Sequence, residues 1–133
     1  MEIKQNNQSG KDQLNKFSLI KQLAGFRYAF SGLKILLKEE HNARIQLFAG
    51  TCALIAGFVF KISIIEWIAV IFCIGWVIAL EAVNSAIENT TDLISKEKNE
   101  TIKKIKDLSA GAVLIAAIAS AIIGLIIFLP KIF

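Results

Sequence analysis

The sequence predicts an all-α membrane protein in which an amphipathic interfacial helix precedes three transmembrane helices. Apolar residues make up 55% of the 133-residue chain. Its mean hydropathy of +0.59 is higher than soluble domains of ordinary composition show. Three apolar segments are long enough to cross a hydrocarbon core, which needs about 20 residues of helix. The length is that of a single domain.

The first element is a polar segment, residues 1–16, which we expect to be a cytosolic tail because it lacks the apolar stretch of a secretory signal. Residues 17–133 then form one membrane domain. It begins with a surface helix over about 17–40, where apolar residues recur every three or four positions and so share one face. They are Leu19, Leu23, Phe26, Phe30, Leu33 and Leu37. A basic amphipathic helix beside a span lies in the membrane interface, and packing of its apolar face on the bundle is the alternative.

The predicted transmembrane helices cover about residues 45–62, 64–87 and 109–129. The first is uncharged as far as Lys61, and only a short turn separates it from the second. We therefore expect these two helices to form a tight hairpin. The third is uncharged and ends at Pro130.

Lysine and arginine are concentrated in two parts of the chain. Of the 15, eight precede the first span and five lie between the second and third, which leaves Lys61 and Lys131. Because Lys and Arg are retained on the cytoplasmic side, we expect the N-terminus and residues 88–108 in the cytosol and the C-terminus outside the inner membrane. This bias explains the basic residues without a nucleic-acid partner, which we do not expect.

The second span contains a carboxylate, Glu81, about 26 Å across a core about 30 Å thick and near its cytosolic side. The same helix face then carries Asn84, Ser85, Glu88 and Asp92. An acidic residue inside a span is energetically costly, and by default it indicates function. The alternative is an interfacial glutamate that reaches toward water. We interpret this polar stripe as a candidate site.

Polar residues at the starts of the other two spans fall at the same depth. Glu39, Glu40 and Arg44 precede the first span, and Lys106 and Asp107 precede the third. Carboxylates with an amide can hold Mg²⁺, which is commonly bound through one or two carboxylates and substrate phosphates. A lysine can contact those phosphates, and a carboxylate can accept the proton of an attacking hydroxyl. This combination predicts phosphoryl transfer to a hydroxyl at the membrane surface.

Two other interpretations remain open. One is a non-catalytic small membrane oligomer, in which the acidic residues pair with Lys and Arg at the interface. The other is an intramembrane proton or ion pathway through Glu81, although no acidic or basic residue lies between Glu81 and Glu66 to continue it. The chain lacks both the G-x-x-x-x-G-K-[ST] and the G-x-G-x-x-G loops, so any ATP binding is unconventional. A zinc site is not expected, since His41 is the single histidine.

Three segments occur in the order and at the spacing of a known family. They are GLKILLKEEHNARI (32–45), EAVNSAIENTTD (81–92) and IKDLSAGAV (105–113). On these segments the chain resembles the small prokaryotic lipid kinases, the family of diacylglycerol kinase and undecaprenol kinase, over about residues 17–130. The resemblance implies a homotrimer in the lipid bilayer with active sites shared between protomers. It also implies transfer of the γ-phosphate of magnesium-bound ATP to a lipid alcohol.

The resemblance further implies roles for individual residues. Glu81 would be the general base, and Asn84 would help to position it or the phosphate. Glu40 and Glu88 would bind the metal ions. The residues on the nucleotide side would be Lys106, Asp107, Asp92, Glu97 and Tyr28. Those beside the lipid substrate would be Glu81, Lys21, Gly32 and Arg44.

Two features bear on the lipid acceptor. Lys21 stands where the diacylglycerol kinase branch tends to carry an arginine. A lysine keeps the positive charge but lacks the bidentate fork of the guanidinium group. The segment EEHNARIQ is more similar to the undecaprenol kinase branch. The sequence therefore slightly favours undecaprenol, which would give undecaprenyl phosphate, over diacylglycerol, which would give phosphatidic acid.

Overall fold

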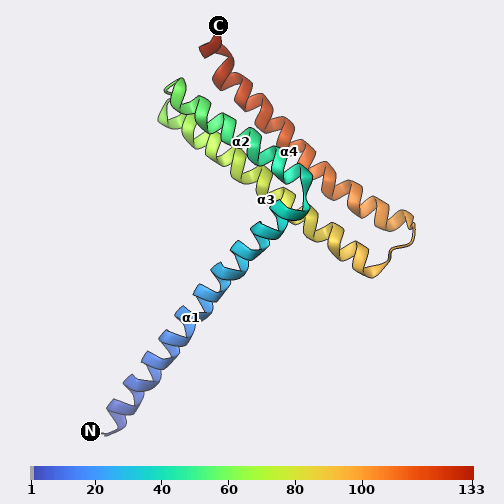
Figure 1. The fold of residues 1–133 in the computed structure, drawn as a ribbon. Helices are drawn as coiled ribbons and strands as arrows, with labels where there is room; N and C mark the ends of the chain where they lie inside the picture. The colour runs from blue at the N-terminus through green and yellow to red at the C-terminus, as the bar shows by residue number, and fades with distance from the viewer. Residues whose placement is uncertain (1) are drawn as a thin grey trace. The chain divides into compact units, whose positions relative to one another are not determined.

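The computed structural model consists of four helices, α1 (Glu2–Glu39), α2 (His41–Val59), α3 (Ile64–Ile94) and α4 (Glu100–Ile132) (Figure 1). It describes the backbone of residues 2–133 and the side chains from Ser18 onward. α2, α3 and α4 are each long and apolar enough to cross a membrane. The predicted all-α membrane fold with three spans is confirmed.

The chain divides into two compact units, Met1–Ile35 and Leu36–Phe133. The first consists of most of α1, which begins at Glu2 and so includes residues 2–16 of the polar segment that we expected as a tail. The predicted apolar face of this helix is uncovered, since each of its first four side chains is more than half exposed: Leu19, Leu23, Phe26 and Phe30. Its placement in the membrane interface stays a prediction.

A tight turn joins α2 to α3. Lys61 in this turn has a left-handed backbone conformation, with a φ of 50°, which few residues other than glycine adopt. α3 then begins with a capping box, in which the Ser63 hydroxyl accepts from the Glu66 N–H and the Glu66 carboxylate accepts from the Ser63 N–H. The predicted hairpin is present. α2 ends at Val59, slightly before the predicted boundary, because the turn interrupts its hydrogen bonding.

Small residues at intervals of seven allow α2 to approach α3. Ala43 is fully buried, and Gly50 and Gly57 are buried on the same face of α2. A Cβ added to Gly50 would lie 3.2 Å from Ile74 Cγ2, and one added to Gly57 would lie 2.8 Å from Trp67 Cη2. These residues therefore determine how closely the two helices pack.

Substitution of Gly57 by Ala is expected to destabilise the hairpin by about 1–3 kcal/mol, because the added methyl group overlaps the Trp67 ring. The free energy of unfolding can be measured by titrating the protein in mixed micelles with a denaturing detergent. Gly75→Ala is the matched control, since nothing lies within 4 Å of a Cβ there, and it should remain within about 1 kcal/mol of wild type. Equal stability of the two variants would contradict this account of α2 and α3.

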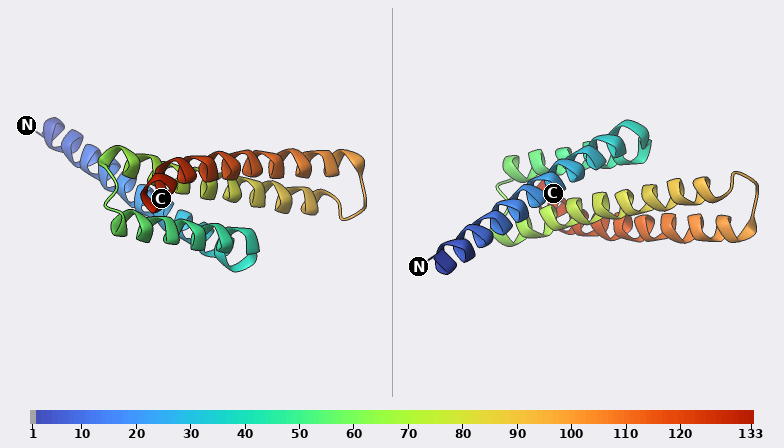
Figure 2. Two further views of the ribbon diagram at one scale, coloured as in Figure 1. Left: turned by 90° about the horizontal axis from the view of Figure 1, so that it is seen from above. Right: turned by 90° about the horizontal axis from the view of Figure 1, so that it is seen from below.

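α3 and α4 lie side by side in both views of Figure 2. One ion pair joins them near each end: Lys131 lies 2.8 Å from Glu66 at the end with the hairpin turn, and Lys106 pairs with Asp92 at the other. Both helices extend beyond the apolar segments that predicted them, which leaves a short connection over residues 95–99. Apolar length indicates only the part of a helix that crosses lipid, and polar turns can continue the helix in water.

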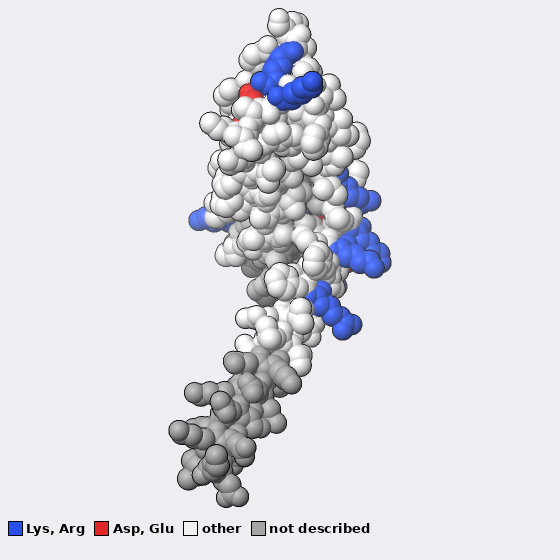
Figure 3. All heavy atoms as spheres, turned by 90° about the vertical axis from the view of Figure 1, so that its left-hand side faces the viewer, with Lys and Arg blue, Asp and Glu red and all other residues white. Residues whose placement is uncertain are grey.

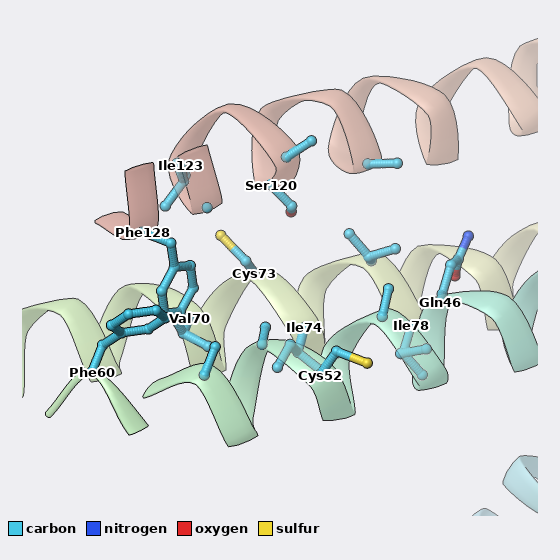
Figure 4. Close-up of a pocket in the computed structure, with 18 of the residues that line it drawn as sticks. Gln46, Cys52, Phe60, Val70, Cys73, Ile74, Ile78, Ser120, Ile123 and Phe128 are labelled. Carbon is cyan, nitrogen blue, oxygen red and sulfur yellow. The ribbon is translucent and has the colours of Figure 1, made fainter. Parts of the chain in front are cut away.

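Most of the apolar surface of the three candidate spans is uncovered within the chain. Only 17% of α2, 22% of α3 and 17% of α4 is buried over their most apolar windows. An apolar groove of about 510 Å³ lies between these helices (Figure 4). These surfaces are available to lipid or to other copies of the chain.

Candidate active site

The predicted polar stripe lies on the inner face of α3. Among the side chains that the structure describes, the buried polar ones are Glu81, Asn84, Ser85 and Thr91. Glu81 is only 2% exposed. Since burial of a carboxylate is unfavourable unless it is paired or hydrogen-bonded, the contacts of this residue are central to the site.

α2 and the residue that precedes it contribute one contact each to this stripe. The Gln46 amide Nε2 donates to Glu81 Oε2 at 3.2 Å. Glu40, the extended residue between α1 and α2, accepts from the Ser85 hydroxyl at 2.8 Å. The break in the helix at Glu40 therefore places a second carboxylate beside α3, one turn from Glu81.

Asn84 is held between α3 and α4 by two hydrogen bonds. The Ser109 hydroxyl donates to Asn84 Oδ1 at 2.6 Å, and Asn84 Nδ2 donates to Glu88 Oε1 at 3.1 Å. Because the Glu88 carboxylate only accepts, the NH₂ group of Asn84 must face it, which leaves Oδ1 toward Ser109. The Ser109 hydroxyl also lies 2.9 Å from the Lys106 carbonyl oxygen of its own helix. Ser109 therefore supports the orientation in which Asn84 donates to Glu88.

Two lysines of α4 form ion pairs near this end of the helix. Lys106, a third exposed, pairs with Asp92 across the α3–α4 contact. Asp107 pairs with Lys103 one turn earlier in α4, and both side chains are more than 60% exposed. The structure thus pairs Lys106 with Asp92 and directs Asp107 toward solvent, and the nucleotide roles of these three residues stay predictions.

The remaining five predicted site residues take part in none of these contacts. Glu97 is exposed in the connection between α3 and α4, and Arg44 is exposed on α2. Lys21, Tyr28 and Gly32 belong to the first unit of the chain. The roles of these five residues stay predictions.

Sequence reasoning missed two residues that contact the stripe, Gln46 and Ser109. Gln46 gave a signal, because it is a polar residue in the otherwise apolar start of the first span. Ser109 gave none beyond its position three residues after Lys106. Both contacts cross between helices, and so they depend on the rotation of each helix about its axis.

The donor atoms of this site fit a hard cation that is completed by other ligands. Within the part of the chain that is described, no three His, Cys, Asp or Glu side chains form a metal-binding group. Glu40 and Glu88 each use one carboxylate oxygen in a hydrogen bond to a neighbouring side chain. Neither Oε2 atom has a partner among the described side chains. Two such oxygens suit Mg²⁺, which keeps its remaining positions for water and phosphate.

Three candidate spans with carboxylate, amide and lysine side chains at one end supply the groups that a membrane enzyme of the phosphotransferase class needs. The model of the family described as prokaryotic diacylglycerol kinase matches residues 27–128. The chain belongs to this family.

Characterised relatives agree with this assignment. Undecaprenol kinase of Bacillus subtilis is 40% identical over 121 residues, which cover 91% of this chain and 94% of that protein. Diacylglycerol kinase of a Synechocystis species is 35% identical over 109 residues, which cover 81% of this chain and 62% of that protein. Diacylglycerol kinase of Haemophilus influenzae is 33% identical over 90 residues, which cover 68% of this chain and 76% of that protein. The chain is therefore a membrane lipid kinase, as its resemblance in sequence predicts.

Proposed function

We propose that this kinase transfers the γ-phosphate of magnesium-bound ATP to the hydroxyl of a membrane lipid, with Glu81 as the general base. The observation that carries the proposal is a buried carboxylate inside an apolar span, at the end where Glu40 and Glu88 also lie. In this proposal the lipid hydroxyl approaches Glu81 from the edge of the hydrocarbon, and the 2% exposed side chain must become accessible to it for transfer. A carboxylate that accepts its proton makes the oxygen a better nucleophile.

Glu40 and Glu88 are the proposed ligands of Mg²⁺, through the oxygens that their hydrogen bonds leave free. When bound, the metal supplies positive charge to the phosphates during transfer. Asn84 keeps Glu88 oriented. Ser85 does the same for Glu40.

On the nucleotide side, Lys106 is the proposed contact to the ATP phosphates. The Lys106 side chain can leave Asp92 and contact a phosphate without movement of the helices, because the ion pair is partly exposed and surface ion pairs of this kind are weak. The other proposed nucleotide residues are Asp92, Asp107, Glu97 and Tyr28. Those proposed beside the lipid are Lys21, Gly32 and Arg44.

The proposed orientation places the active site and the N-terminus in the cytosol and the C-terminus outside the inner membrane. Figure 3 shows basic side chains near the C-terminal end of the molecule and an uncharged surface directly below them. Lys61 and Lys131 alone supply Lys or Arg to the outer side, and the positive-inside rule assigns the more basic side to the cytosol.

A homotrimer is proposed as the functional state. The uncovered apolar surface of the spans and the family support it. Mass measurement of the detergent-solubilised protein by light scattering should give three chains. A stable monomer with full activity would contradict it.

The acceptor is proposed to be undecaprenol in preference to diacylglycerol. The relative named undecaprenol kinase is similar over nearly all of its own length, which supports this preference. With γ-labelled ATP and magnesium in mixed micelles, label should appear mainly in undecaprenol when both lipids are offered at equal concentration. Label mainly in diacylglycerol would contradict the preference, and label in neither lipid would contradict the proposed acceptors.

Substitution of Ser109 by Ala is expected to lower kcat by roughly 2- to 10-fold, the usual effect of one neutral hydrogen bond. The reason is that the Asn84 amide loses the partner that supports its orientation toward Glu88. The magnesium concentration for half-maximal rate should rise in parallel. Ser120→Ala, the same change farther along α4, is the control and should leave both values unchanged. An unaltered magnesium requirement in Ser109→Ala would contradict the role of Ser109.

A further inference from the structure

Glu81 has a single hydrogen bond to its carboxylate among the described residues, and the donor is Gln46. The amide Nε2 lies 3.2 Å from Glu81 Oε2. The other atom of the amide, Gln46 Oε1, is buried and has no hydrogen-bond partner. The amide nitrogen of this side chain therefore donates to Glu81, while its amide oxygen accepts no hydrogen bond.

The backbone places Gln46 against α3 because of its neighbours on α2. Ala43 and Gly50 lie three residues before it and four residues after it, and so they share its helix face. Both are buried, and Gly50 leaves only 3.2 Å between an added Cβ and Ile74. This close approach of the helices brings Gln46 within hydrogen-bonding distance of Glu81.

Gln46 also stands at the border between polar and apolar surroundings. It lines the apolar groove between α2, α3 and α4, at the opposite end from Phe60 and Phe128 (Figure 4). The groove on this side is lined mainly by apolar side chains. A hydrogen bond to the carboxylate is correspondingly hard to replace.

We propose that Gln46 is the positioning residue of Glu81 and supports it in both of its protonation states. The inference rests on the proposed function of Glu81 as the general base. While Glu81 is a carboxylate, Gln46 Nε2 donates to it. After Glu81 accepts the proton of the lipid hydroxyl, a half-turn of the amide lets Oε1 accept from the new O–H group. Because Oε1 has no other partner, this half-turn breaks no further bond.

The charges around Glu81 make such a neutral partner useful. Two further carboxylates lie near Glu81: Glu40, which accepts from Ser85 one turn along α3, and Glu88, two turns along α3. Lys106, the α4 cation near this end, is paired with Asp92. A lysine at position 46 would hold only the charged form of Glu81, and an acidic residue would add a third negative charge. An amide serves both forms.

The test compares Gln46→Leu, which keeps the size and removes the amide, with wild type in mixed micelles at saturating substrates. We expect kcat to fall roughly 10- to 100-fold, the effect of losing a hydrogen bond to a charged group, while KM for ATP changes by less than about twofold. The acidic limb of the pH profile of kcat should move to higher pH, because the charged form of Glu81 has lost its donor. Thr51→Val, on an exposed part of α2, is the control and should match wild type.

A wild-type kcat and pH profile in Gln46→Leu would overturn the inference. If Gln46→Leu does not fold, Gln46→Glu is the variant that tests the inference. A second carboxylate beside Glu81 must move the acidic limb of the pH profile of kcat to higher pH. An unmoved limb would overturn the inference. Wild-type protein that phosphorylates no lipid overturns the proposed function together with this inference. Active wild type with unaffected Gln46 variants overturns this inference alone.

Discussion

Replacement of Glu81 by Gln is expected to lower kcat by about 10²- to 10⁴-fold, the usual contribution of a general base. Glutamine has nearly the size of glutamate, and its amide oxygen can still accept from Gln46 Nε2 at the same position. The packing of α2 on α3 is therefore retained. What is lost is the carboxylate that takes the proton of the lipid hydroxyl.

The measurement is the rate of phosphate transfer from labelled ATP to the lipid acceptor in mixed micelles. The oligomer mass and the helical circular dichroism serve as the check on folding. Glu66→Gln is a matched control, because Glu66 lies near the opposite end of the same helix and pairs with Lys131. It should keep kcat near wild type. Wild-type turnover in Glu81→Gln would rule out Glu81 as the base.

Substitution of Glu88 by Gln is expected to lower the apparent affinity for magnesium by roughly 100-fold or more, because removal of a ligand should cost at least as much as loss of a supporting residue. The remaining amide oxygen is a weaker ligand for a hard cation than a carboxylate. Glu40→Gln should act in the same direction, since Glu40 is the other proposed ligand. High magnesium should partly restore the rate of each variant.

The experiment records initial rate against magnesium concentration at a fixed, saturating concentration of ATP. Glu100→Gln removes a carboxylate of the same type at the start of α4, on the exposed part of that helix. This control should show the wild-type magnesium curve. An unchanged magnesium requirement in both Glu88→Gln and Glu40→Gln would contradict the proposed metal ligands.

Much of the candidate site follows from helix periodicity alone. The spacing of Glu81, Asn84, Ser85 and Glu88 places them on one face of any α-helix. In the structure the first three are buried and Glu88 is half-buried. The depth of Glu40 and Lys106 follows from the lengths of the apolar segments. Each of these predictions uses one helix at a time.

The contacts between helices could not be predicted in the same way. Gln46 reaches Glu81, and Ser109 reaches Asn84, only because of how each helix is rotated and how closely it packs. That packing depends on Gly50 and on the shape of the side chains opposite it. A periodic pattern contains no information on the distance between two axes.

The amino-acid sequence by itself determined the fold class, the three spans, the charge asymmetry and the stripe of carboxylates on α3. These features depend on local quantities, namely apolar length, the 3.6-residue repeat and the positions of charges. The tertiary structure alone decided which polar atoms meet: Gln46 with Glu81, Ser85 with Glu40, and Ser109 with Asn84. Hydrogen bonds require donor and acceptor within about 3 Å, and only the packing of whole helices sets distances that finely.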